Sequence, residues 1–161
     1  MLMKLILLLT SIFGIICQLL YWSRLPEKVA THFDAKGLPN GWMLNESNFI
    51  FSSVILVFIT SVFLLTPFLL KKCPTKWINF PKKDYWLAPE RKESSILIIS
   101  NWMYFIGLAT NIFLIIIFHL AYIANTTNPV KLNNDLFFPV LIIYLLISIG
   151  WGITLHIRFN K

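Results

Sequence analysis

Four long apolar runs dominate the sequence. Three stretches with more polar residues separate them. The runs cover residues 5–22, 49–70, 96–124 and 136–155. Each run reaches the length of roughly 18 to 20 residues that a helix needs to cross the hydrocarbon core of a bilayer. The pattern therefore predicts an all-α membrane protein with four transmembrane helices, forming a single integral membrane domain over residues 1–161.

The first run has a competing interpretation as a cleaved signal peptide. Lys4 precedes the run, and Tyr21 and Trp22 end it as an interfacial aromatic anchor would. No A-x-A-like cleavage site follows it. A lipoprotein site at Cys17 fits poorly, because Ile16 is too large for the position before a modified cysteine. We expect an uncleaved helix.

The composition supports a membrane protein and changes how the charge is interpreted. The chain is 57% hydrophobic and 13% charged, with a net charge of +7, whereas soluble domains carry about one quarter charged residues. A net positive charge can indicate nucleic acid binding. Here the basic residues flank the apolar runs, so they indicate membrane topology and anionic headgroups instead.

The basic residues are distributed unevenly between the two sides of the membrane. The two termini and the stretch between the second and third runs carry Lys4, Lys71, Lys72, Lys76, Lys82, Lys83, Arg91, Lys92, Arg158 and Lys161. The opposite side carries Arg24, Lys28, Lys36 and Lys131. The positive-inside rule predicts a multi-pass protein of the cytoplasmic (inner) membrane with both termini in the cytoplasm.

The outward stretch, residues 25–42, has the pattern of a short ordered loop. Apolar and polar residues alternate over 29–34, which is typical of a strand, and residues 36–41 are rich in turn-forming Gly, Pro and Asn. His32 and Asp34 are two positions apart, so they share one edge of an extended strand. We predict ligand or partner contacts at His32, Phe33, Asp34 and Trp42.

The same acids and bases have other interpretations. Glu27, His32 and Asp34 are candidates for acid–base chemistry. His32 and Asp34 could also bind a metal with Glu27 or Glu46, but no recognised spacing of three or four ligands is present. Hydrogen bonding within the loop is the alternative for His32 and Asp34. We therefore expect no metal site, no cofactor and no catalytic residue.

The cytoplasmic stretch, residues 73–95, mixes basic and aromatic side chains. Three prolines exclude a long regular helix. Such a mixture can stack on nucleic acid, but between two membrane runs it more often lies on the headgroup layer. We predict contacts of Tyr85, Trp86 and Arg91 with lipid or with a regulatory protein, and no nucleic acid partner.

Three polar residues lie inside the third run, at Asn101, Asn111 and His119. Asn101 and His119 are 18 positions apart, or five helical turns, and so share a face; Gly107 and Asn111 share another. Such residues usually face other helices. They predict either interhelical hydrogen bonds or a polar path for an ion or substrate. No run has an acid in its interior, which favours the hydrogen bonds.

Signals at the helix ends give further expectations. Asn45, Ser47 or Asn48 is expected to cap the start of the second helix. Pro67 is expected to kink or close that helix near its far end. Pro139 is expected in the first turn of the fourth helix, where proline is tolerated.

Two motifs resemble those of a known family. The outward stretch contains LPxxVxTHFDxxGxPxGW, from Leu25 to Trp42, and the cytoplasmic stretch contains NFPxxxYWLAPER, from Asn79 to Arg91. The first motif, directly after a first membrane helix, resembles a bacterial integral-membrane domain of unknown function. The second is similar to a motif of some stand-alone members of this group. That domain also forms the N-terminal part of SdpI-type toxin-immunity proteins. The resemblance implies a membrane protein, immunity to a secreted toxic peptide and sequestration of a transcriptional repressor at the membrane.

Three functional hypotheses follow. The leading one is a non-enzymatic membrane protein of a sensing, immunity or signalling type. Its partners would be the bilayer and a peptide or membrane protein, and a homo-oligomer is compatible with so small a bundle. The second is a small transporter, or a subunit of one, using Asn111 and His119. The third is a membrane enzyme using Glu27, His32 and Asp34.

Overall fold

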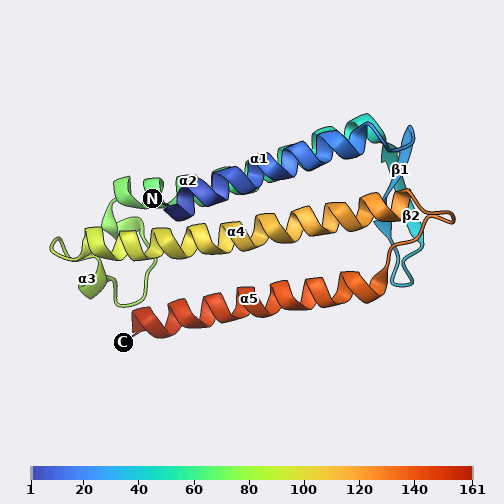
Figure 1. Ribbon diagram of the computed structural model, residues 1–161. Helices are drawn as coiled ribbons and strands as arrows, with labels where there is room; N and C mark the ends of the chain where they lie inside the picture. The colour runs from blue at the N-terminus through green and yellow to red at the C-terminus, as the bar shows by residue number, and fades with distance from the viewer. Residues whose placement is uncertain (1, 161) are drawn as a thin grey trace.

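The computed structural model describes residues 2–160 and contains four long helices and a β-hairpin (Figure 1). The long helices are α1 (Leu2–Trp22), α2 (Asn45–Lys72), α4 (Lys92–Asn125) and α5 (Asn134–Asn160). All four are long and apolar enough to cross a membrane. The predicted four-helix membrane fold is confirmed, and these helices imply a lipid bilayer as the protein's environment.

Shorter elements connect the helices. The hairpin strands are β1 (Lys28–Phe33) and β2 (Pro39–Leu44), and the connection between α2 and α4 contains the 3-10 turn η1 (Thr75–Trp77) and the single-turn α3 (Lys83–Trp86). Figure 1 shows the hairpin at one end of the molecule and both termini with α3 at the other. The predicted cytoplasmic side of the latter end stays a prediction. Lys161, one of its basic residues, lies outside the described residues.

The helices extend beyond the predicted apolar runs at nearly every end. α4 has 34 residues, which at about 1.5 Å per residue makes it roughly 50 Å long, against about 30 Å for a hydrocarbon core. Apolar content marks only the part of a helix that lies in hydrocarbon. Polar residues at its ends continue the same backbone hydrogen bonding into the headgroup region.

The expectations about helix ends were wrong in several respects. None of the three predicted residues caps α2, because Leu44 occupies the N-cap position without a side-chain hydrogen bond. The Asn45 amide instead turns back and donates to the Trp22 carbonyl at 2.8 Å. Pro67 does not close α2, because this helix continues to Lys72; a kink at Pro67 stays a prediction. Pro139 lies in the second turn of α5, because this helix begins at Asn134.

α1, α2 and α4 pack into a three-helix unit around the buried side chains of Leu7 and Leu56. Two glycines set the closeness of this packing. A Cβ at Gly14 would lie 2.8 Å from Leu56, and a Cβ at Gly107 would lie 2.7 Å from Phe63. Small residues that let helices approach closely are typical of membrane interfaces, where van der Waals contact drives association.

Polar pairs join the same three helices. The fully buried Asn111 of α4 donates from Nδ2 to Thr60 Oγ1 of α2 at 2.8 Å. Nearer the hairpin, Ser52 of α2 contacts Gln18 Oε1 of α1 at 3.0 Å. Each pair places polar groups away from lipid and ties two helices together.

α5 is attached differently and packs mainly against α4. None of the residues in its most apolar 18-residue segment is buried. Trp151 donates from Nε1 to the Trp102 carbonyl at 2.9 Å. Tyr144 stacks on Phe113 with ring centroids 4.3 Å apart, and its hydroxyl lies 3.1 Å from the hydroxyl of Thr110. α5 is therefore a peripheral helix fastened by a few side chains.

Candidate functional site

The hairpin at the end of the bundle is antiparallel and contains a bulge. Ala30 pairs with Trp42 and His32 pairs with Gly41, so Thr31 is the extra residue on β1. A bulge breaks the alternation of side chains along a strand. Before it, Val29 and Ala30 are both buried. The predicted strand at 29–34 corresponds to β1, whereas the predicted turn at 36–41 is partly wrong, because β2 begins at Pro39.

The hairpin turn is held by Asp34 and Gly37. Asp34 Oδ1 accepts hydrogen bonds from the backbone N–H of Lys36 at 2.8 Å and of Leu38 at 2.9 Å. Gly37 has a φ of +78°, and a Cβ there would collide with the Leu132 carbonyl. The Leu132 N–H donates to the Gly37 carbonyl at 2.9 Å. The Asp34 carboxylate therefore fixes the turn.

Asn125 at the end of α4 fastens the hairpin to the bundle. Its Oδ1 accepts from the Ala30 N–H at 2.7 Å, and its Nδ2 donates to the Ala30 carbonyl at 2.9 Å. The same Nδ2 also contacts the Ala121 carbonyl at 2.9 Å. Asn125 is buried. One side chain thus satisfies both backbone groups of a strand residue, as a neighbouring strand would.

A cavity of about 210 Å³ lies between the hairpin and the three-helix unit. All three helices and both strands contribute to it. Its lining residues are Gln18, Tyr21, Leu25, Ala30, Thr31, His32, Met43, Asn48, Phe51, Ser52, Ile117, Phe118, Ala121, Tyr122 and Asn125. We call this space the hairpin cavity. Its walls combine aromatic and aliphatic surface with several hydrogen-bonding groups, the usual composition of a ligand site.

Gln18 is the distinctive polar group of the hairpin cavity. The residue is 4% exposed. Its Oε1 contacts Ser52, but its Nε2 has no hydrogen-bond partner among residues 2–160. A buried N–H without a partner costs free energy, and native proteins pair nearly all such groups. Because Gln18 lines the cavity, an acceptor that reached its Nε2 would satisfy this N–H.

The predicted outer contacts divide into two groups. His32 is exposed and lines the hairpin cavity, with its ring beside Gly41, where a Cβ would come within 2.9 Å of it. Trp42 is 45% exposed. Phe33 instead packs against the core cluster of Leu120, Ala124 and Leu132. Phe33 and Asp34 therefore make contacts within the chain, while His32 and Trp42 remain accessible.

The sequence interpretation missed Gln18, Ser52 and Asn125. A signal was present for the first two, because each is a polar residue within an apolar run, as Asn111 is. Antiparallel helices joined by a short hairpin also place Gln18 and Ser52 at similar depths. Asn125 ends the third run and gave no separate signal, since its role depends on where the hairpin folds.

Of the predicted intramembrane residues, Asn111 and His119 each contact another helix, Asn111 through Thr60 and His119 through Tyr21. His119 and Asn101 share a face, as their spacing predicts, but that face is exposed. His119 Nδ1 lies 2.8 Å from the Tyr21 hydroxyl. Asn101 makes no side-chain hydrogen bond within the described part of the chain. The expected interhelical hydrogen bonds are therefore present for Asn111 and His119 and wrong for Asn101. The helical period alone does not show which face of an apolar helix packs against its neighbours.

The predicted inner contacts form a cluster at the other end. Trp86 donates from Nε1 to the Phe159 carbonyl of α5 at 3.0 Å, and its ring meets Phe159 edge to face. The Arg91 guanidinium lies 4.1 Å above the Tyr85 ring centroid. Tyr85 itself is 52% exposed. Trp86 thus holds the end of α5, and Tyr85 stays about half exposed beside Arg91.

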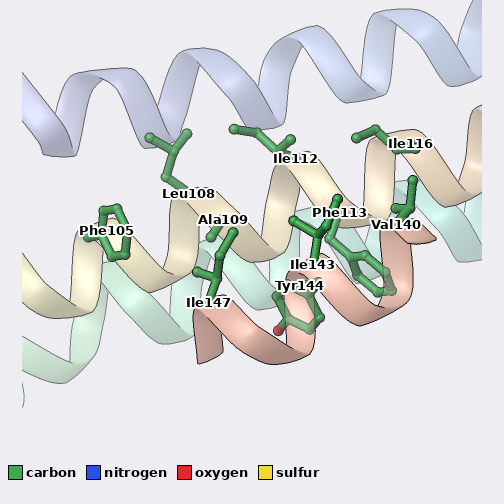
Figure 2. Close-up of a pocket in the computed structure, with 10 residues that line it drawn as sticks. All are labelled: Phe105, Leu108, Ala109, Ile112, Phe113, Ile116, Val140, Ile143, Tyr144 and Ile147. Atoms are coloured by element: carbon green, nitrogen blue, oxygen red, sulfur yellow. The ribbon is translucent and has the colours of Figure 1, made fainter. Parts of the chain in front are cut away.

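Two further cavities flank the three-helix unit. One, of about 740 Å³, lies at the end that carries the termini and is lined by charged residues of α4 and α2 together with Lys4. The other, of about 320 Å³, is an apolar groove between α4 and α5 (Figure 2). Figure 2 shows aromatic and aliphatic side chains from both helices lining it, with the hydroxyl of Tyr144 among them.

Metal-binding side chains are not gathered anywhere in residues 2–160. No group of three or more His, Cys, Asp and Glu residues there lies close enough to hold an ion. Asp34 is engaged in the turn, and the accessible His32 lies among amide, hydroxyl and aromatic neighbours. The hairpin cavity can therefore bind by shape and hydrogen bonding.

The comparisons with known proteins give one family. The model of a domain of unknown function, DUF1648, matches residues 5–58 of this chain. The matched segment contains most of α1, the whole hairpin and the first half of α2, and so includes Gln18, His32 and Ser52. No curated protein and no solved structure matches.

Proposed function

We propose that this chain is a non-enzymatic recognition protein of the cytoplasmic membrane, of a sensing, immunity or signalling type, whose ligand site is the hairpin cavity. The observation that carries the proposal is the buried Gln18 amide, whose N–H has no partner among residues 2–160. It lies in a cavity that the hairpin closes. Such a group is stabilised when a ligand supplies an acceptor.

The size of the cavity favours one kind of ligand. Sites for whole small molecules usually measure about 300–1,000 Å³, and the hairpin cavity measures about 210 Å³. A single side chain of a peptide fits this volume, with the rest of the peptide lying on the exposed hairpin around Trp42. Interfaces commonly place one anchor residue in such a pocket. We therefore propose a peptide as the ligand.

The proposed orientation puts the hairpin outside the cell and both termini in the cytoplasm. The basic residues at the end that carries the termini support this orientation. A secreted toxic peptide, as the resemblance to SdpI-type immunity proteins implies, would then meet the hairpin cavity directly. The exposed Tyr85 would be available to a regulatory protein on the cytoplasmic side.

The packing between the two polar cavities argues against the transporter hypothesis. Gly14 contacts Leu56 and Gly107 contacts Phe63 closely enough that an added Cβ would clash. These contacts lie on both sides of the Thr60–Asn111 pair, so the polar residues there are separated from both cavities by packed apolar side chains. The enzyme hypothesis is weakened because Asp34 Oδ1 already accepts two backbone hydrogen bonds.

Photo-crosslinking from the hairpin cavity tests the proposal. A photoreactive amino acid at His32, in intact cells exposed to the secreted peptides of their own culture, is expected to give a discrete peptide adduct by mass spectrometry. The same probe at Trp77, which is 75% exposed at the other end, is the control and should not give that adduct. Gln18→Leu should reduce the His32 adduct. Lipid adducts alone from His32 would overturn the proposal.

A further inference from the structure

The cavity at the end that carries the termini has its own chemistry, separate from the hairpin cavity. We propose that it binds a zwitterionic phospholipid whose headgroup carries a primary ammonium. Its carboxylates would receive the ammonium, its lysines would receive the phosphate, and its apolar wall would take the first part of an acyl chain. We call it the headgroup cavity.

The headgroup cavity lies where the apolar parts of three helices end. Lys4 belongs to the first turn of α1, Lys71 to the last turn of α2, and Glu93 to the first turn of α4. The first run begins directly after Lys4, the second ends directly before Lys71, and the third begins three residues after Glu93. Charged residues at the ends of spanning helices lie in the headgroup layer. The cavity therefore lies at the level of the lipid headgroups.

The charges that line the cavity are balanced. Lys4 and Lys71 provide two positive charges, and Glu90 and Glu93 provide two negative charges. A purely anionic ligand would meet two carboxylates there, and a purely cationic one would meet two lysines. A zwitterion with a phosphate and an ammonium matches both signs. The surrounding lysines outside the cavity attract anionic lipid without selecting a headgroup.

The existing ion pairs do not block the binding of a headgroup. Lys71 Nζ lies 3.6 Å from Glu93 Oε1, and the two side chains are 65% and 89% exposed. Glu90 pairs with Arg91 at 3.6 Å, also at the surface. Exposed pairs of this kind contribute little stability. A headgroup can therefore insert between the partners and form charge-assisted hydrogen bonds with both.

The remaining walls suit the lipid body. Phe68 of α2 and Leu97 of α4 line the cavity and are more than half exposed. Ser94 and Tyr104 add hydroxyl groups on the α4 side. The volume of about 740 Å³ is within the range of sites that enclose a complete small ligand, which leaves room for a headgroup and the adjoining glycerol.

The carboxylates distinguish among headgroups. A primary ammonium offers three N–H donors to Glu90 and Glu93, whereas a quaternary ammonium offers none. Hydrogen bonds to charged groups contribute enough that losing one or two changes affinity about tenfold. We therefore expect phosphatidylethanolamine to bind about tenfold more tightly than phosphatidylcholine with the same acyl chains.

Native mass spectrometry of the full chain tests this expectation. Phosphatidylethanolamine, phosphatidylcholine and phosphatidylglycerol with identical acyl chains are added at equal concentrations, and bound lipid is counted. The preference for phosphatidylethanolamine over phosphatidylcholine should vanish in Glu90→Gln/Glu93→Gln. The control Glu27→Gln/Glu46→Gln removes the same charge at the hairpin end and should keep it. Lys4→Gln/Lys71→Gln should lower the binding of both zwitterionic lipids.

Size-exclusion elution and thermal unfolding establish that each variant is folded before lipid binding is compared. Equal retention of the two zwitterionic lipids by the unaltered protein would overturn the proposal. So would preferential retention of phosphatidylglycerol, or a preference for phosphatidylethanolamine that survives the change of Glu90 and Glu93. These results are independent of the hairpin cavity, which lies at the opposite end of the helices.

Discussion

The three-helix unit and α5 are equally apolar in sequence but are packed in different ways. α1, α2 and α4 meet through glycine contacts and through the buried Thr60–Asn111 and Gln18–Ser52 pairs. α5 lies beside α4, and no residue of its most apolar 18-residue segment is buried. The indole of Trp151 and the hydroxyl of Tyr144 reach α4, and the Phe159 carbonyl accepts a hydrogen bond from Trp86 in the connection between α2 and α4.

The difference shows what holds membrane helices together. Lipid is as apolar as the helix surfaces, so apolar character alone does not drive association; close packing and interhelical hydrogen bonds do. The three-helix unit has both over its length and carries the hairpin cavity. α5 has fewer such contacts and leaves an apolar groove against α4 (Figure 2).

Matched glycine substitutions give the largest expected contrast. Gly107→Ala brings a Cβ to within 2.7 Å of Phe63 in the three-helix unit, and overpacking of this kind costs about 1–3 kcal/mol. At Gly150 of α5 no atom lies within 4 Å of an added Cβ. Gly150→Ala should leave the free energy of unfolding unchanged or raise it by up to about 1 kcal/mol. Unfolding in mixed micelles by SDS titration measures both.

The two substitutions together test whether the three-helix unit is packed more closely than α5. If Gly107→Ala and Gly150→Ala changed the free energy of unfolding equally, the close approach at Gly107 would not distinguish the two regions.

Two asparagines on the same helix give the next contrast. Asn111→Leu removes the hydrogen bond to the buried Thr60 hydroxyl and should lower the free energy of unfolding by about 1–2 kcal/mol. Asn101 is exposed, so Asn101→Leu removes a polar group from the lipid-facing surface and should be neutral or stabilising. The same SDS titration compares them. A larger loss for Asn101→Leu would indicate that this face is covered by a partner.

The smallest expected effect concerns the fastening of α5. Trp151→Phe keeps an aromatic ring but removes the Nε1 hydrogen bond to the Trp102 carbonyl, which should cost about 0.5–1.5 kcal/mol. Because this bond joins α5 to α4, the loss should appear as a broader distance distribution between spin labels on these helices, with the α1–α2 distribution unchanged. Broadening of both distributions would show that α5 supports the whole bundle.

The helices were predictable because a bilayer leaves few alternatives to long apolar helices. β2 was missed because Pro39, Asn40 and Gly41 are turn-forming residues, and their place in a strand depends on pairing with β1 and on the fastening of Ala30 by Asn125. Local sequence preferences contain no information about that distant amide.

The candidate site was less predictable than the fold. His32 and Trp42 stood out because they lie in a short polar loop, and both are accessible in the structure. Gln18 acquires its importance only when α1 lies against α2 and the hairpin closes above them. Asn101 and Asn111 have the same chemistry in sequence, and only the packing of α4 separates the exposed residue from the buried one.

The most direct test of the proposed recognition site is crosslinking from His32 in three backgrounds. Asn125→Leu removes both hydrogen bonds that fasten Ala30 to α4, and Trp151→Phe loosens only α5. We expect a peptide adduct in the otherwise unaltered chain and in Trp151→Phe, and its loss in Asn125→Leu. An adduct that survives Asn125→Leu, or that disappears in Trp151→Phe, would contradict a site formed by the hairpin and the three-helix unit.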